Sequence, residues 1–142
     1  MRALLDVNVL VALLDAAHVH HAAASGWLDR NLEQGWASCP LTQNGCLRVL
    51  SSESYPRPQP VAAIAARLRE ATATRFHEFW PDDFSVLDTT RLDHDWLLRT
   101  RQVNDGYLLS MAVRRDGVFV TLDRGIDLNL VRGAQSRHVL VI

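Results

Sequence analysis

The 142-residue sequence contains no lysine, because all fifteen of its basic residues are arginines. This absence excludes chemistry that requires an ammonium group, such as a phosphate-loop lysine or a Schiff base. The formal net charge is −1, so the protein has no global basic field of the kind that drives non-specific binding to nucleic acid. Any contact with nucleic acid must therefore be local, and arginine is suited to it because it binds phosphate through paired hydrogen bonds.

Cysteine and long hydrophobic runs are also scarce. Cys39 and Cys46 are too few to build a zinc site by themselves, and without a secretion signal we expect reduced thiols rather than a disulfide. No stretch approaches the roughly 20 apolar residues of a membrane span. Asp6, Asn8 and Asp15 interrupt the apolar N-terminal region, which argues against a signal peptide. These absences predict a cytoplasmic protein with no membrane partner.

Apolar runs and residue spacing predict an alternation of strands and helices within one domain, residues 1–142. Strands are expected at residues 3–5, 36–39, 84–87, 118–122 and 139–142. Helices are expected at residues 7–14, 20–32, 42–50, 61–71, 92–98 and 104–115, with one more helical turn at 76–80. This order is typical of an α/β fold, in which helices cover both faces of a mostly parallel sheet of about five strands.

A carboxylate interrupts the first apolar run. Leu4 and Leu5 lead directly into Asp6, and Val7 and Val9 continue the run. Removing a carboxylate from water without compensation is costly, so its presence there requires a reason. A helix N-cap is one explanation, because residues 7–14 are expected to be helical. The other, which we favour, is a functional site at the end of a buried strand.

Further polar residues follow the predicted strands. Gln43 and Asn44 follow the second strand, Asp105 lies in the first turn of a helix, and Asp123 follows the fourth strand. Because ligands of parallel sheets gather at the carboxyl ends of the strands, we expect these side chains to converge with Asp6 at one edge. A favourable charge in a helix's first turn is the structural alternative for Asp105. This alternative does not explain why all these acids are expected at one edge of the sheet.

Three carboxylates in one crevice repel one another by about 3 to 4 kcal/mol per pair at about 5 Å, with an effective dielectric constant of about 20. A cation relieves this repulsion. Oxygen ligands without cysteine or an organised histidine set favour Mg²⁺ or Mn²⁺, which bind carboxylates, waters and a substrate phosphate. The chemistry that this predicts is metal-assisted hydrolysis at phosphorus.

Four segments of the chain together resemble PIN-domain ribonucleases and, more narrowly, VapC-type toxins of type II toxin-antitoxin pairs. They are residues 4–8 (LLDVN), 39–45 (CPLTQNG), 101–105 (RQVND) and 120–125 (VTLDRG). The resemblance spans essentially the whole chain and implies a three-layer α/β/α sandwich with a Mg²⁺ or Mn²⁺ site. It further implies endonucleolytic cleavage of RNA, homodimerisation, and inhibition by a small antitoxin protein whose tail covers the site.

The resemblance implies roles for residues at matching positions. The acidic metal ligands and catalytic residues are then Asp6, Asp105 and Asp123. Asn8 matches a small polar residue that helps to orient the first acid, and Thr121 lies where the family often has a hydroxyl group near the last acid. Arginines close to these segments are expected to contact RNA, with surface solvation as the alternative. These candidates are Arg48, Arg99, Arg101 and Arg124.

One position departs from the family pattern, because many members carry glutamate where this chain has Gln43. We expect Gln43 to face the catalytic site, where its carbonyl oxygen can accept from metal-bound water but its side chain cannot neutralise a cation. Asp127, one helical turn beyond Asp123, is expected either to supply the missing charge as a metal ligand or to cap a short helix. The functional alternative is a catalytically weak or inactive PIN-like module that mainly partners an antitoxin in an autoregulatory DNA-binding complex.

Other side chains with ligand-binding potential have simpler explanations. His18 and His21 lie three positions apart, as in some zinc sites, but a polar start to an amphipathic helix explains them together with His20. The tryptophans are scattered along the chain, so core or dimer contacts are favoured over base stacking. They are Trp27, Trp36, Trp80 and Trp96.

Overall fold

Five short strands form one parallel sheet in the computed structural model of the protein, which describes residues 1–142. The strands are β1 (Ala3–Leu5), β2 (Trp36–Ser38), β3 (His77–Phe79), β4 (Val118–Thr121) and β5 (Val139–Val141). Their order in the sheet is β3-β2-β1-β4-β5, so β1 lies between β2 and β4. The carboxyl ends of β1 and β4 are therefore neighbours, and the residues that follow these strands lie close together.

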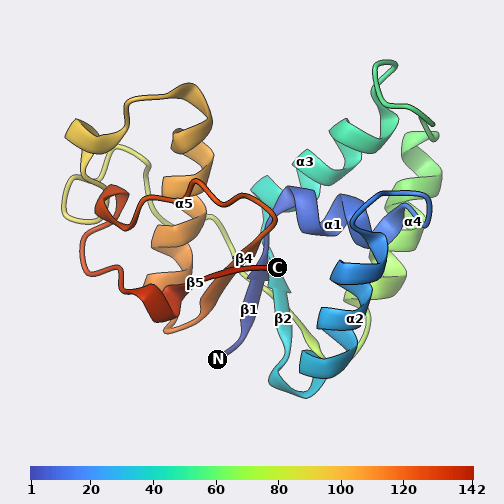
Figure 1. Ribbon diagram of the computed structural model, residues 1–142, viewed down its shortest axis with the longest axis horizontal. Helices are drawn as coiled ribbons and strands as arrows, with labels where there is room; N and C mark the ends of the chain where they lie inside the picture. Colours follow the sequence, from blue (N-terminus) through green and yellow to red (C-terminus); the bar gives the residue numbers. More distant parts are fainter.

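Helices cover both faces of the sheet (Figure 1). One face carries α1 (Val7–Leu14), α2 (His21–Asn31), α3 (Pro40–Ser51) and α4 (Val61–Thr72), and the other carries α5 (Thr100–Arg114). Short 3₁₀ turns lie in the connections: η1 (Leu32–Gln34), η2 (His94–Trp96), η3 (Leu128–Leu130) and η4 (Ser136–His138). The predicted three-layer α/β/α arrangement is confirmed. None of the helices combines the length and apolar character needed to cross a membrane.

The side chains of β1 contribute to both halves of the core. Ala3 and Leu5 pack with residues of α1, α2, α3 and α4, whereas Leu4 packs with α5 on the opposite face. All three residues are buried, because the central strand is covered on both sides. This double burial explains why β1 has a continuous apolar sequence, and it places Asp6 at the exact point where the buried strand ends.

Three segments differ from the sequence prediction. Residues 77–79 form the edge strand β3, where a helical turn was expected. Residues 84–87 form no strand. The Phe84 ring instead stacks on Tyr107 with centroids 4.4 Å apart, and the Tyr107 hydroxyl donates to the Phe84 carbonyl at 2.9 Å. The helix expected at 92–98 is reduced to η2, which Asp93 caps. The strand count is right, but β3 takes the place of the strand expected at 84–87.

Two helices begin earlier than predicted. α3 begins at Pro40 rather than near Thr42, and the Thr42 hydroxyl accepts from the Cys39 backbone N–H at 3.0 Å within the first turn. α5 begins at Thr100, so Asp105 lies in its second turn rather than its first. A charge at the start of a helix therefore does not explain Asp105.

Candidate active site

Asp6 occupies the turn between β1 and α1 and is nearly buried, with 7% of its surface exposed. Its Oδ1 accepts a hydrogen bond from the Val7 backbone N–H at 2.7 Å, so the residue does cap α1. Its Oδ2 accepts from the Thr121 hydroxyl at 2.6 Å, which capping does not require. Burial raises the pKa of Asp6, and these two hydrogen bonds oppose the rise.

Thr121 links the ends of the two central strands. Its buried hydroxyl donates to Asp6 and accepts from the Asn8 side-chain amide at 3.2 Å and from the Asp123 backbone N–H at 3.1 Å. Asn8 in turn accepts from the Leu122 backbone N–H at 3.1 Å. Asn8 therefore contacts Asp6 through Thr121 rather than directly, and the loop after β4 is fixed against the start of α1.

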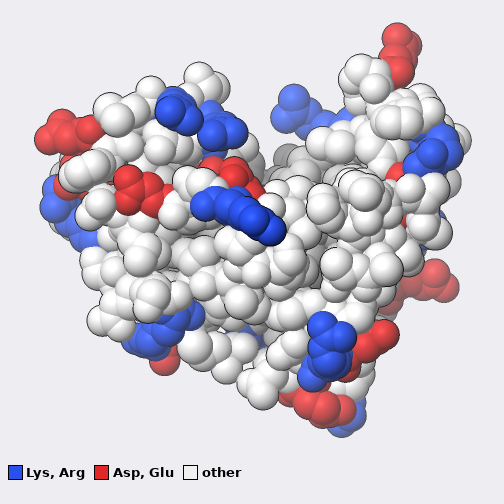
Figure 2. Space-filling view, in the orientation of Figure 1, with Lys and Arg blue, Asp and Glu red and all other residues white.

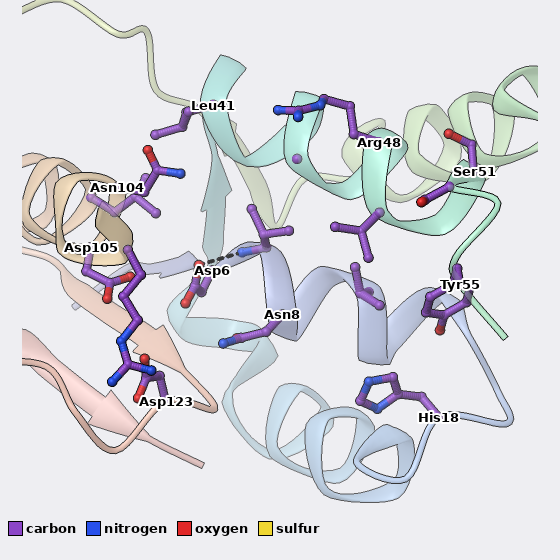
Figure 3. Close-up of a pocket in the computed structure, with 17 residues that line it drawn as sticks. Asp6, Asn8, His18, Leu41, Arg48, Ser51, Tyr55, Asn104, Asp105 and Asp123 are labelled. Carbon is purple, nitrogen blue, oxygen red and sulfur yellow. Dashed lines mark hydrogen bonds between the residues drawn. The ribbon is translucent and has the colours of Figure 1, made fainter. Parts of the chain in front are cut away.

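Asp123 and Asp105 complete an acidic group with Asp6. Asp123 follows β4, and its Oδ1 accepts from the Gly125 backbone N–H at 2.7 Å. Asp105 projects from α5 on the same side of the cavity as Asp6 and Asp123 (Figure 3). Burial raises the pKa of Asp105 to about 6, the charges of Asp6 and Asp123 add to the rise, and Arg101 opposes it. The three carboxylates are thus close enough to interact electrostatically.

These carboxylates offer oxygen donors of the kind that Mg²⁺ and Mn²⁺ bind. No three carboxylate, imidazole or thiolate groups converge tightly enough to form a complete ligand set for one ion. Mg²⁺ often binds through only one or two carboxylates and fills its remaining positions with waters and substrate phosphate. Burial is the main reason that the pKa of Asp105 is raised, and the charges of Asp6 and Asp123, which a cation would compensate, add to the rise.

The acidic group borders one end of a cavity of about 910 Å³. In the space-filling view, the molecule is hollowed between the part that contains α5 and the part that contains α3, with basic side chains on both sides of the hollow (Figure 2). The close-up shows α1 running along the cavity from Asp6 towards His18 and Tyr55 at the opposite end (Figure 3). The cavity is therefore elongated, and the acidic group occupies only part of it.

One face of α3 lines this cavity. Leu41, Gly45 and Arg48 recur there at helical spacing. A Cβ at Gly45 would lie 2.5 Å from Cγ2 of Val7, a separation that side chains do not tolerate. Glycine at this position therefore lets α3 pack directly against α1.

The structure does not bring Gln43 to the cavity, contrary to the prediction. Its Nε2 donates to the buried Ser38 hydroxyl at 3.0 Å, and its side chain borders a smaller cavity of about 270 Å³ together with Asn44 and residues of α4. The prediction failed because α3 begins at Pro40, which places residues 43 and 44 on the helix face directed towards α4.

Asp127 also lies outside the lining of the large cavity. Its Oδ1 accepts from the Asn129 backbone N–H at 2.9 Å, so it caps η3. The residues between Asp123 and Asp127 form a turn rather than a helix, and a spacing of four therefore does not place the two acids on one face. Of the two roles expected for Asp127, the structure supports capping and not metal binding.

The arginine candidates fall into two pairs. Arg48 on α3 and Arg101 on α5 both line the cavity. Arg99 and Arg124 are exposed and do not line it. Arg48 and Arg101 are therefore the guanidinium groups positioned to contact a phosphate within the cavity.

Sequence reasoning missed the end of the cavity opposite the acidic group. The Tyr55 hydroxyl there donates to Asp15, which is 5% exposed and follows α1. A signal for Asp15 was present, because it ends the mostly apolar segment 7–14 that follows Asp6. Nothing in the sequence indicates its contact with Tyr55, since 40 positions separate the two residues.

Two of the three N-terminal histidines contact each other, and the third contacts the end of α1. His18 lines the cavity, and its Nδ1 accepts from the His20 backbone N–H at 3.0 Å. A ring nitrogen of His21 lies 2.7 Å from the Ala12 carbonyl oxygen. They do not form a metal-binding group.

The chain is similar to known proteins in sequence and in fold. A family model described as PIN domain matches residues 3–129. Ribonuclease VapC44 of Mycobacterium tuberculosis is 50% identical over 142 residues, which is 100% of both chains. Ribonuclease VapC39 of the same organism is 41% identical over 127 residues, 89% of this chain and 91% of that protein.

Among solved structures, the crystal structure of VapBC2 from Rickettsia felis bound to a DNA fragment from their promoter is similar, with a TM-score of 0.58. The match covers 87% of this chain and 89% of that chain at 14% sequence identity. At this identity, the likeness shows a shared fold alone.

Proposed function

The chain belongs to the PIN-domain family, and we propose that it is a toxin that hydrolyses phosphodiester bonds within RNA and is held inactive by a cognate antitoxin. The observation that carries this proposal is the acidic group of Asp6, Asp105 and Asp123 in one cavity. Burial and repulsion from the other two carboxylates raise the pKa of Asp105 there, as expected for metal ligands in a metal-free protein. The names of similar proteins, ribonucleases of the VapC type, support the same activity. We take residues 1–142 as a single domain of this kind.

Mg²⁺ or Mn²⁺ is the cofactor that suits these side chains. Asp6, Asp105 and Asp123 would hold it through carboxylate oxygens, without Gln43 or Asp127. When bound, such an ion lowers the pKa of a water molecule and stabilises the charge that develops on the phosphate.

The chain's own residues prepare the site for RNA. The Thr121 hydroxyl fixes the direction of the Asp6 carboxylate, and Asn8 fixes Thr121. Arg48 and Arg101 supply guanidinium groups that bind phosphate oxygens and hold the strand in the cavity. The local arginines thus provide the RNA attraction that a net charge of −1 does not.

Two protein partners belong to this proposal and rest on the family resemblance. One is a small antitoxin whose tail covers the cavity and excludes RNA. The other is a second copy of the chain, which forms a homodimer.

Cleavage of single-stranded RNA by the purified protein in Mg²⁺ tests the proposal, with Asp6→Asn and Asp127→Asn compared beside the parent. Asp6→Asn removes the charge of a nearly buried ligand. Asp127→Asn makes the same chemical change outside the cavity, at a cap that asparagine also serves. We expect cleavage by the parent and by Asp127→Asn, and no cleavage by Asp6→Asn or by the parent in EDTA. Equal inactivity of all three proteins, with Mn²⁺ still bound by the parent, would instead support the non-catalytic module.

A further inference from the structure

The cavity continues beyond the acidic group, and its opposite end has a different chemistry. Asp6 precedes α1 and Asp15 follows it, so the two ends lie roughly 13 Å apart at about 1.5 Å per helical residue. His18, Tyr55 and Ser51 border the far end (Figure 3). The acidic residues that line the cavity all belong to the other end, so the far end presents aromatic rings and hydroxyl groups to the cavity, and its own carboxylate, Asp15, lies behind Tyr55 and pairs with Arg57.

A buried carboxylate fixes Tyr55 at this end. Its hydroxyl donates to Asp15, which also accepts from the Arg57 guanidinium at 3.2 Å and from the Ala17 backbone N–H at 3.0 Å. Burial, followed by the neighbouring Asp15, raises the pKa of Tyr55 to about 12, so the phenol keeps its proton. The hydroxyl is thus engaged, the ring packs partly against the core beneath it, and its remaining surface lines the cavity, where it can meet a ligand.

His18 is a second planar group at the far end. Since its Nδ1 accepts from the His20 backbone N–H, the neutral ring carries its hydrogen on Nε2. That N–H can donate to an oxygen or a ring nitrogen of a ligand in the cavity. The far end thus combines two planar rings, those of Tyr55 and His18, with a directional donor.

Arg48 lies on the cavity face of α3, between the acidic group and the two rings (Figure 3). It takes part in none of the ion pairs of the molecule, so its guanidinium is free to bind an anion. Aromatic rings together with a free arginine are the combination that binds single-stranded RNA, because bases stack on the rings and the guanidinium contacts phosphate.

We propose that the far end is a nucleotide subsite, in which Tyr55 and His18 hold the base of a nucleotide that flanks the cleaved bond and Arg48 contacts an intervening phosphate. This inference rests on the proposed function in that RNA is the ligand of the cavity. A strand with its phosphate at the acidic group would follow α1 and reach the rings within a few nucleotides. The subsite would make binding depend on a base at one particular position, and His18 would distinguish bases by their acceptors.

Binding of RNA oligonucleotides that each lack one base tests this subsite. Fluorescence anisotropy in EDTA gives dissociation constants without cleavage for the parent, Tyr55→Leu and Arg48→Ala. In the parent, we expect one position of the oligonucleotide, the sensitive position, where loss of the base weakens binding about tenfold. In Tyr55→Leu, RNA that lacks the base at this position should bind about as tightly as RNA that has it, because the ring on which the base stacks is gone. Arg48→Ala should weaken binding of all the oligonucleotides alike.

Tyr55→Phe and Arg30→Ala are the matched controls. Tyr55→Phe keeps the ring and loses the hydrogen bond to Asp15, so it should retain the sensitive position even if its melting temperature falls. Arg30 is exposed near the end of α2 and does not line the cavity, so Arg30→Ala should bind RNA as the parent does. Should Tyr55→Leu fail to fold, His18→Ala provides the same test, because His18 lies in a turn before α2.

The outcomes distinguish the subsite from the proposed function. If the parent cleaves RNA but Tyr55→Leu keeps the same sensitive position, the subsite is wrong and the nuclease stands. If the parent shows the sensitive position, Tyr55→Leu loses it, and neither Mg²⁺ nor Mn²⁺ supports cleavage, the proposed function fails and the subsite stands. Absence of any sensitive position in the parent would overturn the subsite.

Discussion

Replacing Asp105 by asparagine should stabilise the metal-free protein at neutral pH, although the residue belongs to the proposed active site. The pKa of Asp105 is raised from 3.8 to about 6, chiefly by burial and then by Asp6 and Asp123. Such a group adds no penalty well below pH 3.8, where it is protonated in both the folded and the unfolded state. The penalty grows as the pH rises from about 4 to about 6, and above that it stays at its full value. Asparagine has a similar shape and no charge, so it removes the penalty.

The expected magnitude follows from the size of this pKa change. Each pKa unit corresponds to about 1.4 kcal/mol, which gives about 3 kcal/mol for a change from 3.8 to about 6. Because Asp105 is only partly buried and solvent screens part of the interaction, we expect a gain of about 1 to 2 kcal/mol at about pH 7.5. With about 2.1 cal/mol/K of unfolding entropy per residue over 142 residues, the melting temperature should rise by roughly 3 to 7 °C.

Thermal unfolding in EDTA of the parent, Asp105→Asn and Asp127→Asn, at about pH 4.5 and about pH 7.5, measures this effect. Asp105→Asn should exceed the parent at the higher pH, and the difference should shrink at the lower pH. Mg²⁺ should raise the melting temperature of the parent more than that of Asp105→Asn. Asp127→Asn, which lies outside the cavity, should give no gain. A loss of stability in Asp105→Asn at the higher pH, or an equal gain at both pH values, would refute the electrostatic reasoning.

Three further substitutions test other parts of the site. Thr121→Val removes the hydroxyl that donates to Asp6, and denaturant unfolding should show a free energy of unfolding lower by about 2 to 3 kcal/mol. Thr121→Ser keeps the hydroxyl and should lose much less; equal losses in the two variants would mean that the hydroxyl is unimportant. Gln43→Glu should leave the Mn²⁺ dissociation constant from calorimetry unchanged, whereas tighter binding would show that this side chain reaches the ion. Gly45→Ala forces α3 away from Val7 and should cost about 1 to 3 kcal/mol in the same unfolding assay, and a neutral effect would contradict the close packing.

The parts of the site that follow strands could be predicted from the sequence. Asp6 comes directly after the buried strand β1, and Thr121 and Asp123 lie at the end of β4. The strand determines the position of the residue that directly follows it, and parallel strands have their carboxyl ends at the same edge of the sheet. Local sequence and sheet topology are therefore sufficient to bring these side chains together.

The direction of side chains on helices was harder to predict, because a small shift in the first residue of a helix changes which residues face the cavity. Each residue rotates the helix by about 100°, so the difference between a start at Thr42 and a start at Pro40 decides where Gln43 points. Thr42 has the features of an N-cap, and proline is favoured in the first turn, so both starts fit local preferences. The contact between Tyr55 and Asp15 joins residues 40 positions apart and depends on tertiary packing.

Mn²⁺ binding to the purified protein, followed by loss of the free-ion electron paramagnetic resonance signal, tests most directly whether the acidic group is a metal site. The parent should bind Mn²⁺, and Asp6→Asn, Asp105→Asn and Asp123→Asn should each weaken binding by about tenfold or more. Asp127→Asn should bind as the parent does, because its carboxylate lies outside the cavity. A parent that binds no Mn²⁺, or binding that survives unchanged when any of the three acids is replaced, would contradict the proposed site.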